Sequence, residues 1–174
     1  MKKLRKMLGD INSKECIDLM QLIETQSQHT LSKWAIQYAK DNYLNIYDQY
    51  GLENKDFHCI IHQCEEYLNN QLPLKEVKSY LKEARLIAKD IKSPVAQAAA
   101  RAIATACATI TTPTNALGYL FYGAAAYAYH NAGIESSEII YNELATKELQ
   151  KAHQSLKEVA IENEEKPAKI KWNC

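Results

Sequence analysis

The stretch of sequence that decides the fold runs from residue 102 to residue 134 and reads AIATACATITTPTNALGYLFYGAAAYAYHNAGI. It contains no Asp, Glu, Lys or Arg, although charged residues make up 24% of the 174-residue chain. One interpretation is a membrane hairpin, but residues 111–115 divide the run, and neither piece is a uniformly apolar stretch of about 20 residues. The sequence therefore predicts a central helix pair over residues 94–131, which other helices enclose because a helix apolar on most sides must be buried.

Small side chains dominate this pair of predicted helices. Alanines and threonines lie along the first helix, and glycines and alanines lie along the second. Such residues let two helix axes approach near the low end of the usual range of about 8–10 Å. We expect four of these residues to be almost fully buried: Ala102, Ala106, Gly123 and Ala126.

In the rest of the chain, start and stop signals predict further helices, and no segment predicts a convincing strand. The expected fold is an all-α, single-domain bundle of about seven helices over residues 1–174, with residues 164–174 as a flexible tail around Pro167. Gly51 and Gly133 are expected to end helices, because glycine tolerates left-handed backbone angles. The predicted helix starts lie at Ser13, Ser27 or Thr30, Asn54, Pro73, Ser93, Thr112, and Ser136 or Ser137.

Bulk charge and cysteine content narrow the classes of function. The chain has 21 basic and 21 acidic residues, so net charge predicts neither a nucleic-acid partner nor a membrane partner. Its five cysteines have scattered spacings, which favours free thiols in a reducing cytoplasm over a disulfide framework. Nothing in the sequence predicts a cofactor.

Two histidines one helical turn apart form the most conspicuous local motif. On a helix, His58 and His62 share a face and Cys59 lies beside them, which is a spacing that could supply two or three zinc ligands. The other interpretation is an amphipathic helix with Cys59 or Cys64 packed inside and the histidines at its boundary. In the zinc interpretation, the remaining ligand would have to come from His29, His130 or His153.

Basic residues recur at intervals of three or four in the predicted fourth helix. They form a stripe that suits phosphate or an acidic partner, or that is a solvated helix face. The stripe consists of Lys75, Lys78, Lys82, Arg85, Lys89 and Lys92.

Arg101 is the last charge before the uncharged run. If it points inward it needs a carboxylate, several carbonyls or an anionic ligand, because an unpaired buried charge is very costly; if it points outward it is solvated.

The alanine-rich region resembles an all-helical bacterial family called putative immunity proteins. The resemblance covers roughly residues 75–132, and members of that family are thought to neutralise polymorphic toxins. It implies a helical bundle that acts by binding, not an enzyme. Where the family pattern has histidines, this sequence has Thr105, Thr111 and Asn115, so chemistry tied to those histidines is not expected here. The residues that carry the resemblance are Ala98-Ala99-Ala100-Arg101-Ala102, Ala106, Thr109, Pro113-Thr114 and Ala116.

An immunity-type role implies a protein partner, the cognate toxin, which the chain would occlude through a polar face. Clustered carboxylates suit a basic toxin such as a nuclease, because they speed encounter by electrostatic steering. Whether the chain forms homo-oligomers stays open. The alternative is a helical protein that binds a small molecule or a metal, or an enzyme, and that uses His58, His62 and Arg101. The candidate contact residues of the acidic cluster are Asp41, Tyr47, Asp48, Glu53, Asp56, Glu65 and Glu66.

Overall fold

The computed structural model describes residues 3–50 and 56–172 of the chain. This described part holds seven α-helices, one short 3-10 helix and no strand, so the all-α prediction is confirmed. The helices are α1 (Lys14–Ile23), α2 (Gln28–Asp48), α3 (Asp56–Leu68), α4 (Leu74–Asp90), α5 (Pro94–Cys107), η1 (Ala108–Ile110), α6 (Asn115–Ala132) and α7 (Glu138–Val159).

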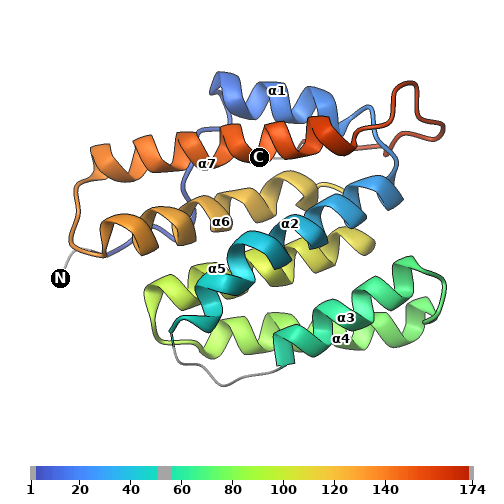
Figure 1. The fold of residues 1–174 in the computed structure, drawn as a ribbon, viewed down its shortest axis with the longest axis horizontal. Coiled ribbons are helices and arrows are strands. Elements are labelled where there is room, and N and C mark those ends of the chain that lie inside the picture. Colours follow the sequence, from blue (N-terminus) through green and yellow to red (C-terminus); the bar gives the residue numbers. More distant parts are fainter. Residues whose placement is uncertain (1–2, 51–55, 173–174) are drawn as a thin grey trace.

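Helices α5 and α6 form the centre of the bundle and pack extensively against each other (Figure 1). The α3–α4 hairpin lies on one side of this pair, α1 and α7 lie on the other, and α2 crosses in contact with both central helices. Ala102, Ala106 and Ala126 have no exposed surface, and Gly123 is also buried. The predicted central pair is therefore confirmed, with the other helices supplying its enclosure.

Helix starts follow the capping chemistry of the sequence at four places and depart from it at two. The hydroxyls of Ser13, Ser27, Ser93 and Ser137 each accept a hydrogen bond from the backbone of the first helical turn. Two expectations were wrong in detail. Pro73 precedes the first residue of α4 instead of lying in its first turn, and the turn at residues 111–114 delays α6 to Asn115, so the Thr112 hydroxyl does not cap it.

Helix ends also follow the sequence in part. Gly133 ends α6 with a φ of 76°, a left-handed conformation that favours glycine. Helix α7 ends at Val159, and Ala160 follows it with an extended backbone. The predicted cap Asn54 and the predicted stop Gly51 lie outside the described residues.

The C-terminal segment packs against the turn between α1 and α2, which corrects the expectation of a free tail for residues 164–172. Glu164 accepts hydrogen bonds from the Ser27 backbone and from the Thr30 hydroxyl, the latter at 2.6 Å. The backbone N–H of Ala168 donates to the Gln26 carbonyl at 2.8 Å. The Trp172 indole donates to Glu24. These contacts satisfy the polar groups of the α1–α2 turn, which is why a polar, proline-containing segment is ordered here.

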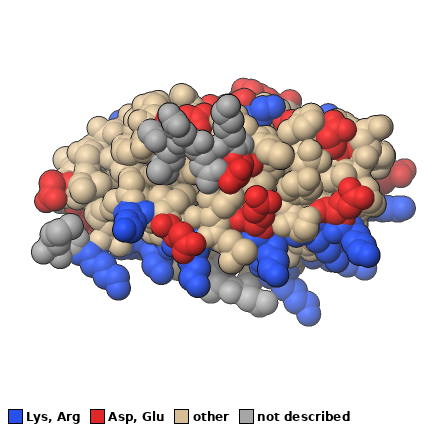
Figure 2. All heavy atoms as spheres, turned by 90° about the horizontal axis from the view of Figure 1, so that it is seen from below, with Lys and Arg blue, Asp and Glu red and all other residues tan. Residues whose placement is uncertain are grey.

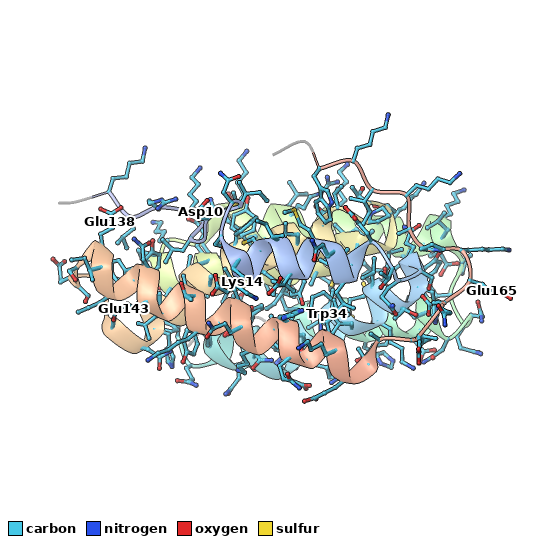
Figure 3. The ribbon with its side chains drawn as sticks, turned by 90° about the horizontal axis from the view of Figure 1, so that it is seen from above. Asp10, Lys14, Trp34, Glu138, Glu143 and Glu165 are labelled. Carbon is cyan, nitrogen blue, oxygen red and sulfur yellow. The ribbon has the colours of Figure 1, made fainter. Side chains whose placement is uncertain are left out.

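Helices α1 and α7 lie side by side over the bundle, and Trp34 of α2 lies beneath α7 (Figure 3). The Trp34 indole donates to the Ser155 hydroxyl at 2.8 Å, and this bond fixes α2 against α7. Within residues 3–50 and 56–172, no helix has the length and apolar character needed to cross a membrane.

The close packing of the central pair predicts a measurable cost for a larger side chain. Replacing Ala106, which is fully buried in α5, by Leu should lower the free energy of unfolding by ~1–3 kcal/mol through overpacking. Urea unfolding of wild type and variant measures the difference. A change within ~0.5 kcal/mol, as at ordinary surface positions, would contradict the central-pair packing.

Candidate partner-binding surfaces

Five of the acidic residues predicted to contact a partner lie on the surface of the neighbouring helices α2 and α3. Two pairs join the helices: the Asp48 carboxylate lies 2.9 Å from His58 Nε2, and Lys40 Nζ lies 2.8 Å from the Glu65 carboxylate. Both pairs are at least partly exposed, so they contribute little to stability and act mainly to position the groups. We call this surface the acidic face and define it by Asp41, Asp48, Asp56, Glu65 and Glu66.

Two residues of the expected contact set do not belong to this face as the structure describes it. Tyr47 is only 1% exposed, and its ring packs edge-on against Phe57 at a centroid distance of 4.9 Å. It is therefore a core residue and not a surface anchor, because its position on α2 faces α3. Glu53 lies outside the described residues. Tyr50, at 38% exposed, supplies an accessible aromatic ring at the end of α2.

The histidine motif lies at the exposed side of α3. His58 Nε2 contacts Asp48, and His62 Nε2 lies 4.0 Å from the Glu66 carboxylate, so each histidine has a carboxylate neighbour. Cys59 is exposed. Across residues 3–50 and 56–172, no group of three His, Cys, Asp or Glu side chains is arranged to hold a metal ion. A zinc site at His58, Cys59 and His62 stays a prediction of the sequence.

The basic stripe of α4 lines one wall of a groove. A hollow of about 540 Å³ lies between α4, the end of α5 and the start of α6. A second hollow of about 270 Å³ adjoins it, because both are lined by Arg85, Ala104 and Thr105. We call the two together the basic groove; its cations are Lys78, Lys82, Arg85, Lys89 and Arg101.

Among the described residues, no carboxylate lines either hollow of the basic groove. Its five cations also form no ion pair within 4.0 Å across the described ranges 3–50 and 56–172. Helical geometry explains the separation: the basic residues of α4 recur every three or four positions, whereas Glu76, Glu83 and Asp90 recur every seven and fall on another side of the helix. Figure 2, which looks onto the α3–α4 side, shows Lys and Arg gathered along one long edge.

Arg101 lies between the two alternatives that the sequence left open, a buried side chain and a solvated one. It is half-buried in α5 and lines the smaller hollow together with Arg85, Lys89 and Tyr122. No carboxylate of the described residues pairs with it. Its guanidinium therefore belongs to the open groove, where water or an anion can satisfy it.

A buried carboxyl in α7 is the polar feature that sequence reasoning missed. Glu148 is 1% exposed, and its Oε1 accepts hydrogen bonds from the hydroxyls of Tyr38 at 2.5 Å and Tyr43 at 3.3 Å. Its Oε2 and the nearby buried Tyr119 hydroxyl have no hydrogen-bond partner in the described structure. Burial raises the pKa of Glu148 above its ordinary value, although the tyrosine bonds and Lys151 act in the opposite direction.

The signal for this burial was present in the spacing along α7. Glu148 does not lie on the solvated face of α7, although most charged residues of that helix are exposed. Tyr141, Ala145, Ala152 and Leu156 form the buried stripe of α7, and Glu148 occurs at the same three- to four-residue spacing. Glu148 therefore joins the core of the bundle and lies away from both charged surfaces.

Comparison with known protein families identifies the family of this chain. A family model described as Imm-5 like putative immunity protein matches residues 21–159, a span that includes α2 to α7 in full. The chain matches no curated protein and no solved structure at a significant level.

Proposed function

Because this chain belongs to the Imm-5 like putative immunity protein family, we propose that it is an immunity protein that binds a toxin and neutralises it by covering its active surface. The observation that carries the mode of binding is the acidic face, where five carboxylates gather on two neighbouring helices. Such a surface attracts a basic partner from a distance and then occupies its cationic site.

The acidic face is built to be rigid before it meets a partner. Phe57 and Cys64 on the inner side of α3 are fully buried, and α2 is anchored by Leu31, Ala35 and Tyr43. The Asp48–His58 and Lys40–Glu65 contacts join the two helices at the surface. Binding by a surface that is already ordered loses little conformational entropy, which favours tight association.

The test pairs the protein with the toxin encoded beside its gene. Exchanging Asp41 and Asp48 for Lys should slow association roughly tenfold or more and reduce its dependence on salt, because steering by the acidic face is lost. Stopped-flow association at several salt concentrations measures both effects. The matched control exchanges Glu138 and Glu143 for Lys, since these residues give the same charge change on exposed positions of α7 (Figure 3).

The possible outcomes distinguish a failure of the acidic-face mechanism from a failure of the immunity function. Equal slowing by both pairs of substitutions would show that net charge matters and the acidic face does not. Association unchanged by Asp41→Lys and Asp48→Lys would overturn the acidic-face mechanism. A toxin that neither binds the wild-type protein nor is inhibited by it would overturn the immunity function.

A further inference from the structure

The basic groove is a second binding surface that the acidic face does not use. We propose that this groove binds an acidic, extended segment of polypeptide. The acidic face lies on α2 and α3, whereas the groove is formed by α4, α5 and the start of α6. The inference concerns a partner of opposite charge and does not require the acidic face to contact a toxin.

Charge is the first argument for an anionic occupant. Lys78, Lys82 and Arg85 line the larger hollow, and Arg85, Lys89 and Arg101 line the smaller one. No carboxylate of residues 3–50 and 56–172 lines either hollow. Elsewhere on the surface Lys14 and Lys40 do have ion-pair partners, at 2.6 Å and 2.8 Å. Gathered cations of one sign raise the local positive potential, which an anion relieves.

Shape favours an elongated occupant. The two hollows share Arg85, Ala104 and Thr105, so they lie next to each other along α4. From Lys78 to Lys89 the α4 wall rises about 16 Å, which an extended chain of about five residues spans. Successive cations on α4 are about 4.5–6 Å apart along the axis. Alternate side chains of an extended chain are about 6.5 Å apart, so acidic residues at every second position come close to this ladder of cations.

The remaining lining residues favour a polypeptide over a nucleic acid. Thr105, Thr112 and Asn115 make no side-chain hydrogen bond within the described ranges, so they are free to bind an occupant. The Asn115 amide can both donate and accept, which matches the N–H and C=O groups of a peptide backbone, whereas phosphate oxygens only accept. Tyr122 is the sole aromatic residue that the described part of the chain contributes to either lining, and single-stranded nucleic acids are usually held by several stacked rings.

The test measures binding of a synthetic ten-residue peptide with Glu at alternate positions, by fluorescence anisotropy with the full-length protein at low salt. The Lys82→Glu and Arg85→Glu double variant should weaken binding tenfold or more. The control variant Lys33→Glu and Lys157→Glu makes the same charge change at exposed positions outside the groove, and it should bind the peptide like wild type. Circular dichroism establishes that both variants are folded.

A third variant tests the contact with the peptide backbone. Asn115→Ala should weaken binding several-fold without changing its salt dependence, because it removes an uncharged contact. Tighter binding of a ten-nucleotide single-stranded RNA than of the peptide, at equal salt, would overturn the proposal in favour of a nucleic-acid site. Absence of peptide binding, or equal weakening by the control variant, would overturn it as well. These readouts need no toxin, so they are independent of the test of the immunity function.

Discussion

Replacing Gly123 by Ala should destabilise the protein by about 3 kcal/mol, at the upper end of the cost of overpacking. A Cβ atom at this position of α6 would lie 2.0 Å from Cζ and 2.2 Å from the hydroxyl oxygen of Tyr43. The Tyr43 ring cannot easily move away, because it is fully buried and its hydroxyl donates to Glu148. The clash outweighs the gain of about 0.5–1 kcal/mol that Ala otherwise brings to a helix interior.

The same helix offers a matched control for this prediction. A Cβ atom at Gly118 would have its nearest neighbours at 3.9 Å, so Gly118→Ala should stabilise the protein by about 0.5–1 kcal/mol. Urea unfolding of the two variants should therefore give shifts of opposite sign. If Gly123→Ala shifted the unfolding midpoint upward like Gly118→Ala, the close approach of α2 to α6 at Tyr43 would be wrong.

Replacing Glu148 by Ala should cost about 3 kcal/mol, because the buried hydroxyls of Tyr38 and Tyr43 lose their acceptor. Glu148→Gln should be much milder. Its carbonyl oxygen can accept the same hydrogen bonds from Tyr38 and Tyr43, and a neutral amide places no charge in the buried site. Urea unfolding at neutral pH ranks the three proteins.

The sharper test is how the stability difference between wild type and Glu148→Gln changes with pH. Burial raises the pKa of Glu148 in the folded protein above the ordinary value of 4.5. The stabilising effect of its proton is therefore fully present below about pH 4.5 and is lost as pH rises through the folded-state pKa. Across this window wild type should lose stability relative to Glu148→Gln, by about 1.4 kcal/mol for each unit of pKa elevation. A difference that stays constant with pH would contradict the burial of this carboxyl.

The same buried cluster includes two tyrosines of α2 and one of α6. Tyr38, Tyr43 and Tyr119 stack edge to face, with centroids 5.7–6.4 Å apart. Burial and the neighbouring Glu148 carboxyl raise the pKa of Tyr43 well above its ordinary value, so this tyrosine is a neutral hydrogen-bond donor at physiological pH. Tyr38 and Tyr43 thus join α2 to α6 and α7 through Tyr119 and Glu148.

The acidic face and the basic groove differ in how far the sequence could predict them. The spacing of the basic residues on α4 predicts a stripe on its own, because side chains three or four apart share a helix face. That the stripe lines a groove depends on Thr105 and Ala108 of the neighbouring α5–η1 segment, which lie opposite it. Similarly, the acidic residues of α2 and α3 were visible in the sequence, but only helix packing shows that Tyr47 points inward.

The sequence by itself determined the helices, most of their caps and the identity of the central pair. These features depend on interactions between residues a few positions apart and on an uncharged run too long to leave exposed. Tertiary structure alone decided which side chains meet across helices. Tyr38 and Glu148 are 110 residues apart in the chain, and they form a hydrogen bond because α2 crosses the bundle beneath α7. Crossing angles and registers of this kind arise from the packing of whole helix surfaces, which no local pattern specifies.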